Sequence, residues 1–309
     1  MRISDQVRYS GLVSGYGTLL EKQTAIQRQI SSGKQLDHAA DNPNGFSALQ
    51  RATQEQSRLT QNLSNIGQAT DFSTASETAL QNVIDQLQRA SELGTSASDA
   101  TKSPAELASI SNELNTILNG VISTASQSYA GRALFSGAQT GTASFVATTD
   151  ATGKITGATY QGDGTVLSTE DVPGNTIAYS LVGADATGGG FGVFQDVSSG
   201  VDIFKTLATL RDDVNSNSGA IPADLQKLTA SLEHLSLAQS KVGGIQNQLS
   251  NNQSLLQDMN DGVGQMVSKL SDTDLASSIT KLKDLEVAYQ AALAVGAKVG
   301  DLSLLNYLR

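Results

Sequence analysis

The chain has 309 residues, a formal net charge of −10, 5% aromatic residues, no tryptophan and no cysteine. The absence of cysteine excludes disulfides, thiolate metal sites and a cysteine nucleophile, and the acidic balance weighs against nucleic acid, because phosphate binding needs a clustered Lys/Arg face. No segment approaches the ~18 consecutive apolar residues of a membrane span, so no membrane insertion is expected. This composition suits long helices packed side by side better than one compact enzyme.

The beginning of the chain predicts a helix over residues 5–32 that ends at Gly33, a residue suited to the position after a helix. Its start, MRISDQVRYSGLVSGYG, lacks the uninterrupted apolar run of a secretory signal. Apolar side chains recur at heptad spacing along this helix. They are Tyr9, Leu12, Tyr16, Leu19, Ile26 and Ile30, with polar Gln23 as an interruption.

A connector and two further helices are predicted next. The pairs Asn42-Pro43 and Asn44-Gly45 are typical of turns, so residues 33–45 read as a compact connector. A long helical pattern then runs from residue 46 to about residue 96.

The third helix has a clear start signal. In the run Ser103-Pro104-Ala105-Glu106, Ser103 is suited to cap the helix, Pro104 to take its first position and Glu106 to complete a capping box. This helix is predicted to end near Gly131.

Between about residues 137 and 200 the pattern changes. Gly and Thr become frequent, heptad spacing ends, and short alternating runs appear at 158–161, 176–181 and 191–194. Turn-forming Gly, Asp and Pro residues separate these runs. The segment therefore predicts a small β-rich insertion of roughly 60 residues.

Helical spacing returns at residues 203–214 and, after a polar break, from Pro222. A helix over residues 222–270 would be ~73 Å long, which a globule cannot contain. One heptad position of this segment is apolar throughout, at Leu228, Leu235, Val242, Leu249, Leu256, Val263 and Leu270.

The last segment, residues 272–309, contains no proline and offers Asp272 and Thr273 as N-caps. Isolated helices are marginal in water, so we expect this helix to pair with the first one and both to gain full order on assembly with other subunits. Together with the six residues of the first helix, its apolar residues form the predicted assembly interface. They are Leu275, Ile279, Leu282, Leu285, Tyr289, Ala292, Leu293, Val299, Leu302 and Leu305.

The order of these elements predicts a mainly α fold. We expect an elongated rod of long antiparallel, coiled-coil-like helices, with both termini at one end and a small inserted β-rich domain at the other. Three domains are predicted. They are a terminal helical assembly domain (1–45 and 272–309), a helical rod domain (46–138 and 201–271) and a β-rich inserted outer domain (139–200).

Residues that could carry chemistry do not form a site in the sequence. His38 and His234 have no ligands at metal spacing, so both are predicted to be surface residues. The glycine run 188–192 lacks the Gly-Lys-Ser/Thr ending of a phosphate loop. Asp150 and Asp163 lack the ligand alternation of a calcium loop and read as turn residues. No catalytic residue, cofactor or metal is predicted.

Several motifs resemble the flagellin superfamily. They are the opening MRISDQ, the block ISSGKQLDHAADNPNGFSALQ over residues 30–50, and residues 272–308. Within that superfamily, other features are more similar to hook-filament junction proteins than to filament flagellins. These are MRIS, GRALFSGAQT over 131–140, the run YQGD beginning at Tyr160, FKTLATLRDDV over 204–214 and SLLNYL over 303–308.

The resemblance is weak through residues 141–200, apart from the Tyr160 motif. One departure is Lys241, which stands where the family leads us to expect Arg, so a salt bridge of that Arg would be missing.

The resemblance implies a structural, extracellular protein of the bacterial flagellum, exported by the flagellar type III apparatus without a cleaved signal peptide. It implies a junction layer between a hook-associated protein similar to FlgK and the flagellin filament, with other copies of the chain as neighbours. It also implies a dedicated export chaperone that holds the C-terminal segment in the cytoplasm.

Two alternatives stay open. The chain could be a short or minor flagellin that is itself the filament subunit. An enzyme or ligand-binding module in the β-rich insertion is the other, although no titratable residues converge there in the sequence.

Overall fold

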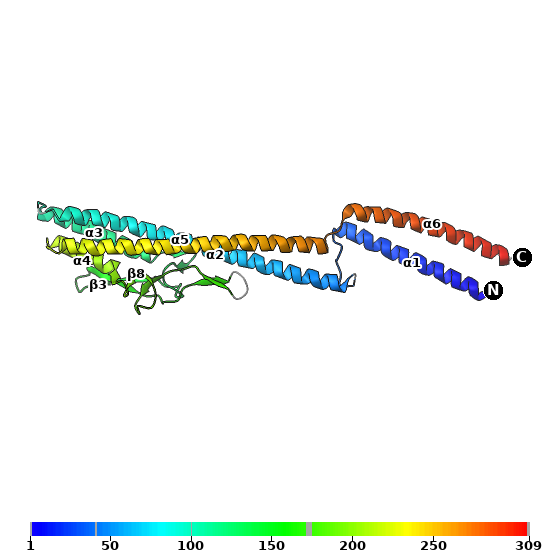
Figure 1. Cartoon of the computed structure of the whole chain (residues 1–309), viewed down its shortest axis with the longest axis horizontal. Helices are drawn as coiled ribbons and strands as arrows, with labels where there is room; N and C mark the ends of the chain where they lie inside the picture. Colours follow the sequence, from blue (N-terminus) through cyan, green and yellow to red (C-terminus); the bar gives the residue numbers. More distant parts are fainter. Residues whose placement is uncertain (1, 41, 100, 171–174, 308–309) are drawn as a thin grey trace. The chain divides into compact units, whose positions relative to one another are not determined.

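The computed structural model describes residues 2–40, 42–99, 101–170 and 175–307 (Figure 1), without the side chains of residues 2–6, 8, 9 and 299–307. Within these residues the fold is mainly α with small sheets, as predicted. The helices are α1 (Arg2–Ser32), α2 (Pro43–Ala97), α3 (Pro104–Ala125), α4 (Ile203–Asn215), α5 (Ile221–Ser271) and α6 (Leu275–Tyr307). The chain divides into two compact units, residues 1–59 with 258–309, and residues 60–257.

The strands form four small sheets in the second unit. The pairs β1–β2, β3–β4 and β5–β6 are antiparallel, and in the three-stranded sheet β8 lies parallel to β7 and antiparallel to β9. The strands are β1 (Ser128–Tyr129), β2 (Arg132–Ala133), β3 (Phe145–Thr149), β4 (Ile155–Tyr160), β5 (Ser168–Glu170), β6 (Thr176–Ala178), β7 (Val182–Asp185), β8 (Gly192–Asp196) and β9 (Val201–Asp202). The three predicted alternating runs overlap β4, β6 and β8, with different bounds.

Helix ends differ from the predictions where a side chain supplies a cap. The Asn42-Pro43 pair was predicted to lie in a turn, but Pro43 begins α2 and the Asn42 Oδ1 atom accepts a hydrogen bond from the Gly45 N–H at 3.0 Å. Proline suits this position because the first helical N–H has no partner within the helix. Gly33 follows α1 with a positive φ of 70°, as expected after a helix.

The third helix begins as predicted and ends earlier. Ser103 and Glu106 form the capping box. The helix stops at Ala125 rather than near Gly131, because the β1–β2 hairpin follows directly and its turn places Ala130 and Gly131 at positive φ.

The predicted long helix over residues 222–270 is present as α5, whose 51 residues correspond to ~77 Å. In the second unit its heptad residues Leu228, Leu235 and Leu249 are fully buried. Side-chain hydrogen bonds from Gln239 to Gln81 and from Gln246 to Glu77 join α5 to α2.

His234 is buried, so its predicted surface position is wrong. Its ring stacks on Phe191 with centroids 4.6 Å apart, and its Nε2 atom lies 2.7 Å from the Gly192 carbonyl oxygen. Lys241 lies over the Phe191 ring, with its Nζ atom 4.9 Å from the centroid. These contacts hold the start of β8 against α5, and the spacing of residues along α5 could not indicate them.

The loop aspartates are turn residues, as predicted. The Asp150 carboxylate accepts hydrogen bonds from the backbone N–H groups of Thr152 and Lys154. The Asp163 carboxylate does the same for Ala138 and Thr165. Their oxygens therefore hold loop backbone in place. His38 is exposed, as predicted.

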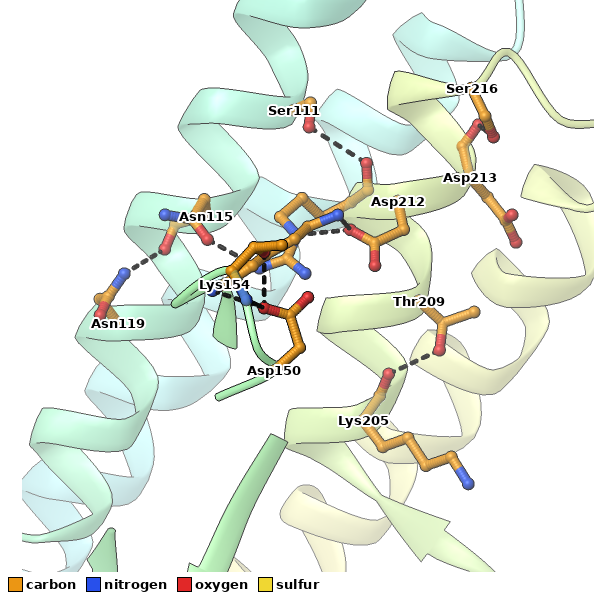
Figure 2. Close-up of polar contacts among 12 residues, drawn as sticks. Ser111, Asn115, Asn119, Asp150, Lys154, Lys205, Thr209, Asp212, Asp213 and Ser216 are labelled. Atoms are coloured by element: carbon orange, nitrogen blue, oxygen red, sulfur yellow. Dashed lines mark hydrogen bonds and ion pairs between the residues drawn. The ribbon is translucent and has the colours of Figure 1, made fainter. Parts of the chain in front are cut away.

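Figure 2 shows polar contacts that join the β3–β4 turn to α4, and α4 to α3. The Lys154 Nζ atom lies 2.6 Å from the Asp212 carboxylate, which also accepts a hydrogen bond from Arg211 at 2.7 Å. Arg211 is only 2% exposed, and its Nη1 atom donates to the Asn115 side chain. Burial opposes ionisation of Asp212, but the hydrogen bonds from Arg211 and Lys154 outweigh it and hold its pKa below the usual range.

Asp212→Asn should destabilise the second unit at neutral pH by about 1–2 kcal/mol, because the buried Arg211 loses its charged partner. A lowered pKa contributes stability above the ordinary carboxyl pKa of about 4, and this is lost as pH falls through the folded-state pKa. The difference in urea midpoint between parent and variant should therefore shrink in acid. The exposed Asp71→Asn is the control; equal midpoints for parent and Asp212→Asn at pH 7 would contradict the assignment.

The pKa of Asp213 shifts in the opposite direction to that of Asp212. A hydrogen bond with the Asp224 carboxyl, burial and the charge of Asp224 raise the pKa of Asp213 above its ordinary value. Asp224 is itself buried and pairs with Lys227 at 3.0 Å. The stabilising protonated form is thus lost as pH rises through the raised pKa. Asp213→Asn, which cannot ionise, should raise the urea midpoint at pH 7 and lose this advantage in acid; an unchanged midpoint at pH 7 would count against the carboxyl pair.

Candidate assembly interface

Helices α1 and α6 lie side by side in the first unit (Figure 1). The backbone of Lys34, just after α1, forms an isolated antiparallel β-bridge with that of Asp272, just before α6. Further along the pair, Tyr16 contacts Ala292. Residue numbers therefore rise along one helix as they fall along the other. The two helices form the antiparallel pair that their heptads predict.

Backbone hydrogen bonds close the pair at the end where α1 stops and α6 starts. The Gln35 N–H donates to the Ser271 carbonyl, and the Thr273 N–H donates to the Gly33 carbonyl at 3.0 Å. Residues 272–274 therefore lie before α6, and the predicted N-caps Asp272 and Thr273 are wrong. Asp274 caps the helix, since its carboxylate accepts from the Ser277 N–H at 3.1 Å.

The structure separates the predicted interface residues into two groups. Those of the first group are half-buried along the contact between the two helices, which we call the seam. On α1 these are Leu12, Tyr16, Leu19, Ile26 and Ile30; on α6 they are Leu282, Leu285, Tyr289 and Ala292.

The second group points away from the seam. Leu275, Ile279 and Leu293 are 49%, 45% and 47% exposed. Their apolar character is therefore not used within the described pair. The side chains of Tyr9, Val299, Leu302 and Leu305 lie outside the description.

Other exposed apolar residues were missing from the prediction. Val13 and Leu20 on α1 are 51% and 53% exposed, and Val287 and Val295 on α6 are 65% and 53% exposed. The seven-residue spacing of Val13 and Leu20 could have indicated a second apolar line beside the seam.

Polar groups also lie within the pair. Gln23, which interrupts the heptads, is half-buried on the seam. Ser278 is only 6% exposed, and its hydroxyl lies 3.1 Å from that of Thr273. The Tyr16 hydroxyl donates to the Ala292 carbonyl at 2.7 Å, and its ring meets Tyr289 edge to face at 6.3 Å.

The described residues contain no group of three or more His, Cys, Asp or Glu that could hold a metal ion. Among the helices in the same ranges, none is long and apolar enough to cross a membrane. The geometry of the α1–α6 pair is that of a packing surface. Some of its apolar side chains contact the other helix, and others are open to solvent.

Comparison with known proteins agrees with this geometry. Residues 3–140 match the model of the bacterial flagellin N-terminal helical region, and residues 225–308 match that of the C-terminal helical region. The chain is 25% identical over 324 residues to the flagellar hook-associated protein 3 of Salmonella typhimurium, with all of both chains covered. It is 31% identical over 115 residues to flagellin 1 of Proteus mirabilis, covering 37% of this chain and 30% of that one.

A solved structure shares the fold. The putative flagellar hook-associated protein from Vibrio parahaemolyticus aligns with a TM-score of 0.64 at 17% identity, over 75% of this chain and 100% of that one. The matched flagellin regions include both α1 and α6 and together make up more than half of the sequence. The chain therefore belongs to the flagellin family of structural proteins of the bacterial flagellum and is not an enzyme.

Proposed function

We propose that this chain forms the junction layer between a FlgK-like hook-associated protein and the flagellin filament, by packing its α1–α6 pair against neighbouring subunits. The similarity to hook-associated protein 3 over the whole chain supports the junction role. The observation that carries the packing role is the row of exposed apolar side chains on the two helices.

Five of these exposed side chains gather on one face of the pair, whereas the exposed Val287 and Val295 lie elsewhere around α6. At 100° per residue, Val13 and Leu20 lie about 80–100° around α1 from the centre of the seam. Leu275, Ile279 and Leu293 lie about 60–100° around α6 in the same rotational sense. In an antiparallel pair, equal rotation from the contact places both sets on the same side, and we call these five residues the outer face.

Burial of the outer face would drive assembly. Removing a Val, Leu or Ile side chain from water contributes about 1.5–3 kcal/mol. The seam residues are only half-buried within one subunit, so neighbours would also complete their burial. The twelve predicted interface residues whose side chains are described thus divide into nine that form the pair and three that would bind the next subunit.

The wider proposal includes the division of the chain into domains and its export route. The terminal segments 1–45 and 272–309 serve assembly, residues 46–138 and 201–271 form the helical body, and 139–200 form the outer domain. The family resemblance supports export by the flagellar type III apparatus without a cleaved signal peptide, and capture of the C-terminal segment by a dedicated chaperone before export.

A short or minor flagellin is the alternative, and the match to flagellin 1 of Proteus mirabilis over 37% of this chain favours it. A deletion strain distinguishes the two. Loss of a junction protein should release flagellin monomers into the medium, whereas loss of a flagellin should shorten or alter the filament.

Removal of residues 272–309 should abolish incorporation into the flagellum, because the remaining α1 would lose its partner along the whole seam. The measurement is the flagellin released into the medium when the truncated gene complements a deletion strain. Val146→Ser, at an exposed position of β3 outside the pair, is the comparison and should leave incorporation intact. Normal incorporation of the chain that lacks residues 272–309 would refute the assembly role of the pair.

Val13→Ser should reduce incorporation several-fold while changing the unfolding free energy of the monomer by no more than about 0.5 kcal/mol, because this side chain is already exposed. Val146→Ser, at a 50% exposed position of β3, is the matched control and should incorporate normally. Incorporation is measured by quantifying the protein in purified hook-filament preparations. Equal incorporation of both variants would show that Val13 does not contact the neighbouring subunit.

A further inference from the structure

Tyr16 differs from the other seam residues listed on α1 because it brings a polar group into the contact. Between the described side chains of α1 and α6, its hydroxyl makes the one hydrogen bond that links the two helices, to the Ala292 carbonyl at 2.7 Å. In an α-helix this carbonyl also accepts from the N–H four residues later, which belongs to Gly296. Tyr16 therefore reaches the backbone inside α6.

Gly296 makes this approach possible. A Cβ atom at this position would lie 2.1 Å from the Tyr16 Oη atom, which is far inside contact distance. Tyr289, one turn before Ala292, covers the side of the ring with an edge-to-face contact at 6.3 Å. Tyr289, Ala292 and Gly296 thus form a socket for Tyr16.

We infer that this Tyr16 socket holds the register between α1 and α6 along the helices, away from the end where backbone hydrogen bonds join Gln35 to Ser271 and Thr273 to Gly33. The aliphatic seam cannot do this well, because a shift of seven residues brings Leu or Ile opposite Leu or Ala again. A polar residue in such a seam specifies register, since only one alignment satisfies its hydrogen bond.

Along the part of α6 whose side chains are described, the sequence permits such a socket at one place. Gly296 is the single glycine between Leu275 and Lys298. A shift of seven residues toward the start of α6 would bring Tyr16 against the side chain of Tyr289, and the hydroxyl would lose its backbone acceptor. Burying an unpaired hydroxyl is unfavourable, so the shifted pair would be disfavoured.

This inference rests on the proposed function, because register decides how the outer face is arranged. Val13 and Leu20 belong to α1, whereas Leu275, Ile279 and Leu293 belong to α6. A shift of seven residues would move the two sets past each other by about 10 Å. Neighbouring subunits would then meet a different surface.

Distances between spin labels test the socket directly, because the chain contains no native cysteine. Ser14→Cys and Ala276→Cys place labels at exposed positions that are offset along the pair, so a shift changes the distance between them. The full-length labelled chain is assembled with an excess of unlabelled chain. The parent should give one distance, whereas Tyr16→Phe and Gly296→Ala should each add a second population or broaden the first.

Two controls match these variants. Tyr129→Phe removes the hydroxyl of a 40% exposed tyrosine in β1, outside the pair, and keeps the aromatic ring. Gly15→Ala adds a methyl group at an exposed glycine with nothing within 4 Å. Both should keep the single parental distance and parental incorporation.

A single parental distance in Tyr16→Phe would overturn the inference, whatever Gly296→Ala does. If the parent incorporates with one distance and both socket variants match it, the socket fails while the proposed function stands. If removal of residues 272–309 leaves incorporation intact, the proposed function fails and the inference fails with it.

Discussion

Two helices packed only against each other cannot bury their contact residues completely, and this constraint governs the α1–α6 pair. Seam residues such as Leu19 and Leu285 stay half-buried. In the other unit, heptad residues of the same type, Leu235 and Leu249, are fully buried. The difference lies in the number of neighbouring elements, since both sets follow the same spacing.

This constraint gives the two units different roles. The second unit has a dense core, in which α3, α4 and the strands surround residues such as Phe145 and Phe194, whose rings meet at 5.5 Å. It also contains charge pairs in which one member is buried, such as Arg211 with Asp212, and loops held by aspartate side chains. The α1–α6 pair leaves apolar side chains exposed, and its hydrophobic gain would be completed by neighbouring subunits.

Local spacing predicted the helices and the seam, because heptad periodicity is set within one segment. It did not predict which apolar residues stay exposed, since Leu275 and Leu282 share one heptad position. Leu275, the first residue of α6, is exposed, whereas Leu282 is half-buried. The burial of His234 depends on a strand distant in sequence. The starts of α2 and α6 were misplaced, at Asn42-Pro43 and at Asp272 and Thr273, because a cap depends on where the first turn forms. Spacing defines this position only to within a few residues.

Hydrogen exchange on the full-length chain tests the central claim most directly. In a dilute monomer, backbone amides of residues 1–35 and 275–309 should exchange rapidly, whereas those of α5 around Leu235 should be protected. In the assembled state the two terminal segments should become protected as well. Strong protection of both segments in the dilute monomer, with no increase on assembly, would contradict the account.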